Sequence, residues 1–330
     1  MKSCFPFSFF RRLFFSSLEE FKVVVLGCGG GPLETNVSGY LLAKKTAENF
    51  IAIDAGSLLS GIYLAHQKKS FQDIKKDEES PYGFEGQILR DRIKAYVISH
   101  AHLDHVAGLV LNAPVDTKKP IFALPPTIDY LRDYLFNGKI WPNFGSEGVE
   151  PCIGQYRYER LSLKQMAAIP ETGLSVEPFE LSHPEGYPST AFLIESSGLY
   201  LAYLGDTASD AMGSQKHLQT LWQALAPLLR QKKLRGLFIE CSYAEHHPGQ
   251  TVEGHLDPSY LMRELRALAA LVNPARPKKG LKHLKIVITH IKDPFVTGCC
   301  IRAQIRKELE KANDLGVEWI FARQGEKLYF

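Results

Sequence analysis

The sequence predicts an α/β protein in which two mixed β-sheets pack face to face and helices cover the two outer faces. Many short apolar runs, rich in β-branched residues, are interleaved along the chain with longer stretches of helical periodicity. This order of elements favours two packed sheets enclosed by helices. The chain has 330 residues, 45% of them hydrophobic and 23% charged, which is typical of a globular protein with a sizeable core.

The expected strands are short apolar runs that end at glycine or polar residues. They cover residues 23–26, 37–43, 50–53, 96–98, 174–181, 190–196, 199–205, 236–241, 284–290 and 317–321. One expected helix follows Ser57 and runs through about His66, and the others cover residues 126–136, 215–231, 257–272 and 300–313. The charged segment 68–91 is expected to be a surface loop.

The densest group of metal-binding residue types follows the expected strand at Tyr96-Val97-Ile98. Residues 100–105 read His-Ala-His-Leu-Asp-His and contain His100, His102, Asp104 and His105. A turn at the end of a strand can direct the first two side chains at one metal ion and the last two at a second. Imidazole and carboxylate ligands without thiolate suit Zn²⁺, Mn²⁺ or Fe²⁺. The sequence therefore predicts a metal-dependent hydrolase rather than a polar loop that happens to be rich in histidine.

A centre with two metals needs about three further protein ligands, and three candidates stand at the ends of expected strands. His183 follows the strand at 174–181, Asp206 follows the strand at 199–205, and His290 ends the strand at 284–290. The Asp206 carboxylate can bridge two cations. A glycine-rich turn, Gly27-Cys28-Gly29-Gly30-Gly31, follows the first strand; its spacing does not fit a dinucleotide loop, so we expect a turn that opens onto the site.

The stretch His100-Ala-His-Leu-Asp-His-Val-Ala-Gly-Leu-Val-Leu-Asn-Ala-Pro114 resembles the signature of the class II cyclic-nucleotide phosphodiesterases, a family of the metallo-β-lactamase superfamily. One position departs, because Ala113 stands where the signature has serine. A second stretch, Thr127 to Phe144, also resembles this family and is not carried by metallo-β-lactamase-fold enzymes in general. The resemblance covers the chain from about Lys22 to the C-terminus.

The resemblance implies a metallo-β-lactamase-like αββα sandwich with two divalent metal ions, Zn²⁺ foremost and Mn²⁺ or Fe²⁺ as alternatives. It implies one metal held by His100, His102 and His183, a second held by Asp104, His105 and His290, and Asp206 between them. It also implies that Asp54, at the end of the third strand, supports the loop that carries the ligands.

The implied reaction is hydrolysis of 3',5'-cyclic nucleotides, cAMP or cGMP, to 5'-nucleoside monophosphates by a metal-bridged hydroxide, with Asp104 among the catalytic residues. Relatives that cleave phosphodiesters use a Glu–His pair near the leaving group, and Glu240 and His255 match that pair in order and context. We therefore expect His255, oriented by Glu240, to protonate the leaving 3'-oxygen.

Two other classes of function stay open. One is another metallo-β-lactamase-fold hydrolase, such as a tRNA 3'-end nuclease, a thioesterase or a lactonase; the other is a non-catalytic cyclic-nucleotide-binding protein. Lysine and arginine gather at 230–235 and 276–285, but there is no glycine-rich basic arm, and the net charge is only +3, so a nucleic-acid substrate is not expected. A binding module has no need of seven metal ligands.

We expect residues 22–330 to form one metallo-hydrolase domain with a cap-like insertion at about 114–172. The aromatics of this insertion could line a purine site or form the core of the cap, and the helical spacing favours the core: Tyr130, Tyr134, Phe136, Trp141 and Phe144. Residues 1–21 form a separate segment and a candidate leader, although Arg11 and Arg12 interrupt its apolar run. The cytoplasm is favoured over the periplasm.

The expected partner is a small cyclic nucleotide. No membrane span is expected, because no stretch is long and apolar enough, and a homodimer is left open. The six cysteines show no Cys-x-x-Cys spacing and are expected to be reduced.

Overall fold

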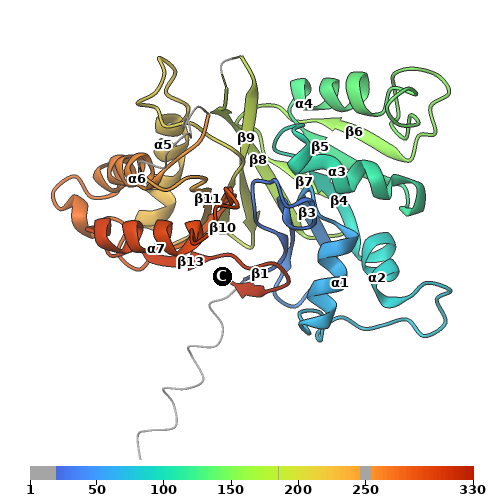
Figure 1. The fold of residues 1–330 in the computed structure, drawn as a ribbon, viewed down its shortest axis with the longest axis horizontal. Helices are drawn as coiled ribbons and strands as arrows, with labels where there is room; N and C mark the ends of the chain where they lie inside the picture. Colours follow the sequence, from blue (N-terminus) through green and yellow to red (C-terminus); the bar gives the residue numbers. More distant parts are fainter. Residues whose placement is uncertain (1–19, 185, 246–253) are drawn as a thin grey trace, which may run out of the picture.

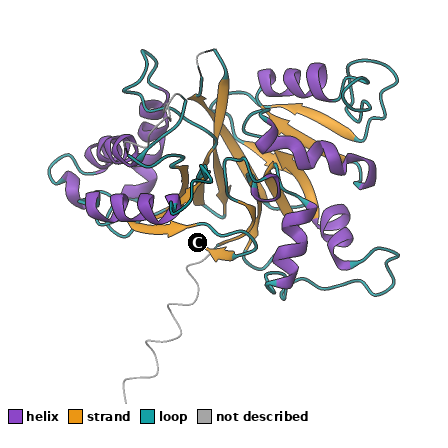
Figure 2. Cartoon of the chain, in the orientation of Figure 1, coloured by secondary structure: helices purple, strands orange, loops and turns teal. Residues whose placement is uncertain are grey.

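Two β-sheets face each other in the computed structural model, which describes residues 20–184, 186–245 and 254–330, and helices cover their outer sides (Figures 1 and 2). The strands of the first sheet are β1 (Phe21–Gly27), β2 (Gly39–Lys44), β3 (Phe50–Ala55), β4 (Ile93–Val97), β5 (Lys119–Ala123), β6 (Tyr156–Arg160) and β14 (Lys327–Tyr329). Those of the second are β7 (Ala167–Ile169), β8 (Leu174–Ser182), β9 (Pro188–Ser196), β10 (Leu199–Leu204), β11 (Leu234–Glu240), β12 (Lys285–Thr289) and β13 (Glu318–Phe321). The expected fold class is confirmed.

Both sheets are built on the same plan. The first has the order β14-β1-β2-β3-β4-β5-β6 and the second the order β13-β12-β11-β10-β9-β8-β7. In the first sheet the pairs from β14 to β3 are antiparallel and those from β3 to β6 are parallel. In the second, the pairs from β7 to β10 are antiparallel and those from β10 to β13 are parallel. Because parallel strands end at one edge of their sheet, the loops after β10, β11 and β12 emerge together.

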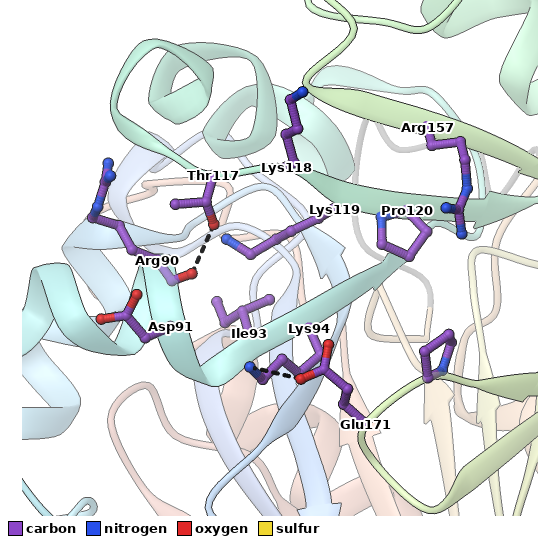
Figure 3. Close-up of a pocket in the computed structure, with 11 residues that line it drawn as sticks. Arg90, Asp91, Ile93, Lys94, Thr117, Lys118, Lys119, Pro120, Arg157 and Glu171 are labelled. Atoms are coloured by element: carbon purple, nitrogen blue, oxygen red, sulfur yellow. Dashed lines mark hydrogen bonds and ion pairs between the residues drawn. The ribbon is translucent and has the colours of Figure 1, made fainter.

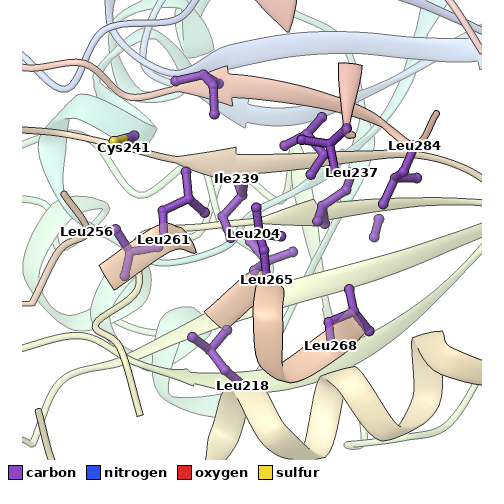
Figure 4. Packing of buried hydrophobic residues seen from close by; sticks show 14 of the residues in the cluster. Leu204, Leu218, Leu237, Ile239, Cys241, Leu256, Leu261, Leu265, Leu268 and Leu284 are labelled. Carbon is purple, nitrogen blue, oxygen red and sulfur yellow. The ribbon is translucent and has the colours of Figure 1, made fainter. Parts of the chain in front are cut away.

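Three apolar layers hold the sheets and helices together. Val23 and Val25 of β1 point into the layer between the sheets, whereas Val24 and Leu26 point into the layer under the helices of the first sheet. This alternation explains why residues 23–26 of β1 are all apolar, since both faces of β1 are buried. Between the second sheet and its helices, leucines such as Leu237 pack in a third layer (Figure 4).

Six α-helices of at least six residues, within the described part of the chain, pack on the outer faces or cap the sheet ends. They are α1 (Leu59–Gln67), α3 (Leu103–Asn112), α4 (Pro125–Tyr130), α5 (His217–Arg230), α6 (Pro258–Val272) and α7 (Ile301–Ala312). The five expected helices lie within two residues of their predicted bounds when a π-helical turn, Leu131–Leu135, is counted with α4. Asp257 fixes the start of α6, because its side chain accepts a hydrogen bond from the Tyr260 backbone N–H at 2.9 Å and Pro258 takes the first helical position. Helix α3 was not expected, and it begins inside the ligand motif.

The structure corrects two predictions about segments outside the main elements. The interval 114–172 is not one insertion, because β5, β6 and β7 lie within it and belong to the two sheets. These strands have only five, five and three residues, too short to show a clear period. The segment 68–91 is not loop throughout: α2 (Phe84–Gln87) and a π-helical turn (Ile88–Arg92) close it, and the buried Gln87 amide donates to two backbone carbonyls of the loop.

The candidate leader, residues 1–21, lies almost wholly outside the described residues. Within the described part of the chain, no helix has the length and apolar character needed to cross a bilayer.

Candidate metal centre

All seven predicted ligands meet where loops from both sheets come together. Ligand atoms of one group, His100, His102 and His183, lie within 4.8 Å of one another, and so do those of a second group, Asp104, His105, Asp206 and His290. The first sheet supplies the residues after β4, and the second supplies those after β8, β10 and β12. The resemblance implied the same two sets of residues, with Asp206 placed between them rather than in the second.

Asp206 lies between the two groups. Its Oδ2 atom is 3.1 Å from His290 Nε2 and 3.7 Å from His183 Nε2, and its Oδ1 atom is 3.3 Å from His105 Nε2. One carboxylate thus faces histidines of both groups, as a bridging ligand must. His290 Nε2 is also 3.1 Å from Asp104 Oδ2, which closes the second group.

Each buried histidine of the two groups uses its other ring nitrogen to bind the protein. His100 Nδ1 lies 3.0 Å from Ser99 Oγ, His183 Nδ1 lies 2.7 Å from the Gly254 carbonyl, and His290 Nδ1 lies 2.9 Å from Ser242 Oγ. Such partners fix the ring and leave Nε2 free to act as a ligand.

Asp54 holds the loop that carries the candidate ligands by hydrogen bonds. Its carboxylate accepts hydrogen bonds from the Ser99 backbone N–H at 2.8 Å, from the Tyr203 hydroxyl at 2.6 Å and from His105 Nδ1 at 2.8 Å. Asp54 is buried and has a positive φ of 50°. A non-glycine residue in this conformation is uncommon, and the hydrogen bonds around it compensate for the strain.

The donor set fits divalent metal ions. His100 Nε2 and His105 Nε2 are buried and have no hydrogen-bond partner within the described part of the chain. His183 Nε2 and His102 Nδ1 face each other at 3.2 Å, although both are acceptors when their outer nitrogens carry the protons. Buried acceptors that converge without donors are costly unless a cation lies among them.

Burial and neighbouring charges shift the pKa values of the candidate ligands in opposite directions. Burial lowers the pKa of His100 far below its usual value and that of His183 to about 4, so both rings are neutral at pH 7, as metal ligands must be. Burial also disfavours charge on His105, but the carboxylates of Asp206 and Asp54 outweigh it and raise the His105 pKa.

Glu240 and His255 form the predicted pair beside the second group. His255 Nδ1 donates to Glu240 Oε1 at 2.9 Å and lies 3.9 Å from Asp206 Oδ2. Both side chains are buried. Burial lowers the pKa of His255, but the Glu240 carboxylate outweighs it and raises that pKa, so the imidazolium form is favoured.

Close packing of backbone supports the ligand loops. A Cβ atom on Gly30 would lie 2.5 Å from Cε1 of the His290 ring, and one on Gly56 would lie 2.0 Å from the Asp104 carbonyl oxygen. Glycine is therefore required at both places. The glycine turn borders the site, as expected.

Sequence reasoning missed two residues that contact this centre. Tyr187 stacks on the candidate ligand His102, with ring centroids 4.3 Å apart and planes 14° apart, and Tyr130 stacks on Tyr187 at 5.1 Å. Lys292 places Nζ 3.0 Å from His255 Nε2. No periodic pattern in the sequence identifies Tyr187. The one sequence feature that distinguishes Lys292 is its place two residues after the candidate ligand His290.

The five aromatics singled out in the sequence do not share one environment. Phe136 and Phe144 are buried in the core beneath the first sheet's helices, and Trp141 packs against it. Tyr130 belongs to the stack beside the metal centre, and Tyr134 is exposed. The core interpretation therefore holds for three of the five.

A surface cavity of about 520 Å³ lies elsewhere, beside the first residues of β4 and β5 (Figure 3). Several cations line it, but Lys94 is paired with Glu171 at 3.2 Å and Lys119 is paired with the buried Asp116. The metal-ligand loop leaves the opposite end of β4. This cavity is therefore separate from the centre.

The two packed sheets and the His-x-His-x-Asp-His loop beside them define the class of metal-dependent hydrolases with a metallo-β-lactamase fold. The chain superposes on unliganded yeast PDE1 with a TM-score of 0.80 at 24% identity, covering 95% of this chain and 100% of that one. It superposes on YhfI from Bacillus subtilis, a metallo-beta-lactamase fold protein, with a TM-score of 0.60 at 16% identity, covering 94% of this chain and 99% of that one.

Within this class, the chain belongs to the family of class-II cAMP phosphodiesterases, whose family model matches residues 21–325. A protein of Aliivibrio fischeri named 3',5'-cyclic-nucleotide phosphodiesterase is 39% identical over 311 residues, which are 94% of this chain and 93% of that protein. A relative from Yersinia pestis is 39% identical over 324 residues, which are 98% of this chain and 92% of that protein. The resemblance seen in the sequence is confirmed.

Proposed function

We propose that this protein hydrolyses 3',5'-cyclic nucleotides to 5'-nucleoside monophosphates at the seven-ligand centre. The observation that supports this most is the convergence of His100, His102, His183 and the Asp104 group in a chain that belongs to the class-II phosphodiesterases. Members of this family act on small cyclic phosphodiesters, which makes cAMP the first substrate to test and cGMP the second.

The residues of each group would hold one divalent ion, with Asp206 shared, and Zn²⁺ fits the nitrogen-rich set best. Bound there, the two ions would supply a nucleophile from water at neutral pH and neutralise charge on the phosphoryl oxygens. The protein fixes their places through Asp54 and Ser99, which hold the ligand loop by hydrogen bonds of 2.8 and 2.9 Å.

His255 would protonate the departing 3'-oxygen. An alkoxide is a poor leaving group, so a proton donor near it lowers the barrier, typically by about 10²- to 10⁴-fold in rate. Glu240 accepts a hydrogen bond from His255 Nδ1 at 2.9 Å, which leaves Nε2 to face the substrate and favours the protonated ring. Asp104 would orient the nucleophile as well as bind metal.

The decisive experiment is turnover of 3',5'-cAMP by purified protein, with metal content determined on the same sample. We expect release of 5'-AMP with about two metals per chain, loss of turnover on chelation, and recovery when Zn²⁺ or Mn²⁺ is restored. A fully metallated protein that leaves cAMP and cGMP intact would contradict the proposal. Pre-tRNA 3'-ends, thioesters and lactones, assayed beside the cyclic nucleotides, would then identify the reaction.

A further inference from the structure

A lysine stands at the open side of the proton-donating pair. Lys292 Nζ lies 3.0 Å from His255 Nε2, the ring atom that Glu240 leaves free. The side chain is half-buried, so it reaches the centre rather than bulk water. Its Nζ also lies 6.0 Å from the centre of the Tyr243 ring.

The backbone fixes Lys292 relative to the metal ligands. Its N–H donates to the Ser242 carbonyl at 3.0 Å, and Ser242 in turn holds His290, two residues before the lysine, through Oγ at 2.9 Å. The same serine hydroxyl donates to the Glu240 carboxylate. Lys292 is therefore tied to the loop that carries the second metal group and the pair Glu240–His255.

The charge balance of the centre calls for another cation when an anionic substrate enters. Four carboxylates surround the ligand atoms, those of Asp54, Asp104, Asp206 and Glu240. Together with a hydroxide supplied from water, these carboxylates would balance two divalent ions and the His255 imidazolium, so the monoanionic phosphate of a cyclic nucleotide brings charge that is left uncompensated. An ammonium group has three N–H donors, and the protonated His255 ring also presents an N–H at Nε2, so an anionic oxygen beside them would accept from both groups.

We propose that Lys292 binds the anionic phosphate of the substrate and thereby selects charged phosphodiesters over neutral esters. This inference rests on the proposed function, since it places the phosphate at the same centre. His255 Nε2 and Lys292 Nζ form adjacent donors on one side of that centre, the first directed to the leaving oxygen and the second to a non-bridging oxygen. Charge-assisted contacts of this kind are stronger than neutral hydrogen bonds.

The test compares Lys292→Met, which removes the charge and keeps the length, with Lys292→Arg, which keeps the charge. Lys282→Met is the matched control, because it removes one exposed lysine that precedes β12, whereas His290 and Lys292 follow the other end of that strand. Metal content, affinity for 5'-AMP and inorganic phosphate by calorimetry, and KM for cAMP are measured on metal-loaded protein. Affinity for adenosine, which lacks the phosphate, is measured in parallel.

For Lys292→Met we expect unchanged metal content, binding of 5'-AMP and phosphate weakened about 10- to 100-fold, and a similar rise in KM. Adenosine affinity should not change, Lys292→Arg should recover most of the loss, and Lys282→Met should match the unaltered protein. Equal phosphate affinity in Lys292→Met would overturn the inference, as would loss of metal in both Lys292 variants. If the unaltered protein turns over no cyclic nucleotide but its phosphate binding depends on Lys292, the proposed function fails while the inference stands.

Discussion

Two buried clusters of polar side chains, one before β5 and one after β4, show how differently a protein interior can treat charge. Before β5, the Asp116 carboxylate accepts from the hydroxyls of Tyr96 and Tyr156 at 2.6 and 2.9 Å and from the Lys119 ammonium group. Lys119 also donates to the Leu89 carbonyl at 2.7 Å. Every charged group in this cluster is satisfied by protein partners.

The cluster after β4 is also buried, but hydrogen-bond partners from the protein do not satisfy all of its polar atoms. His100 Nε2 and His105 Nε2 have no hydrogen-bond partner in the described residues, and the acceptors His102 Nδ1 and His183 Nε2 face each other. The comparison teaches that burial of charge does not by itself mark a functional site. A functional site is marked instead by hydrogen-bond acceptors that converge without donors, because such acceptors need a cation from solution.

The substitution expected to have the largest effect on the unsatisfied cluster after β4 is Asp206→Asn. The amide keeps the shape of the side chain but cannot bridge two cations, so we expect the variant to lose at least one metal ion per chain. Turnover should fall by more than about 100-fold, which is the largest loss typical of removing a residue that only supports a ligand. Metal analysis and cAMP turnover on the same sample check this. Retained metal and retained turnover would show that Asp206 is not the shared ligand.

Asp116→Asn tests the satisfied cluster. The change leaves the Lys119 ammonium buried without its counter-charge, and breaking such a pair costs roughly 3–5 kcal/mol in the free energy of unfolding. Burial already lowers the pKa of Lys119 despite Asp116, so loss of the proton can relieve part of that cost. Denaturant unfolding measures the effect. Turnover and metal content of the folded variant should not change, and a change in either would link the two clusters.

Asp54→Asn should weaken metal binding about 10- to 100-fold, because it removes the carboxylate that accepts from His105 and Ser99 without removing a ligand. Competition with a chelator measures metal affinity. Tyr203→Phe is the matched control, since it removes one donor to Asp54 and keeps the carboxylate. An Asp54→Asn affinity equal to that of the unaltered protein would contradict the supporting role.

The smallest effect is a shift in pH dependence. His255 must be protonated to donate, so the contribution to kcat is present below its pKa and is lost as pH rises through it. The Glu240 carboxylate raises that pKa. In Glu240→Gln the alkaline limb of the kcat profile should therefore move to lower pH. An unmoved alkaline limb would mean that another group limits the reaction at high pH.

Much of the centre was predictable because metal ligands fall at strand ends, where local sequence is informative. The run Tyr96-Val97-Ile98 predicted β4, and the histidines that follow it were predicted as metal ligands. His183, Asp206 and His290 could be found in the same way. The strands β5 and β7 were missed, since elements of five and three residues are too short to show a clear period.

The sequence by itself determined the fold class, the identities of the seven candidate ligands and the family, because these depend on local patterns and on a contiguous motif. Only the tertiary structure decided what holds the ligands in place. His183 Nδ1 binds the Gly254 carbonyl across 71 positions of the chain, and Tyr203 reaches Asp54 across 149. Contacts of such separation leave no periodic trace in the sequence, and the same is true of Tyr187 and Lys292, whose proximity to the centre exists only once both sheets have packed.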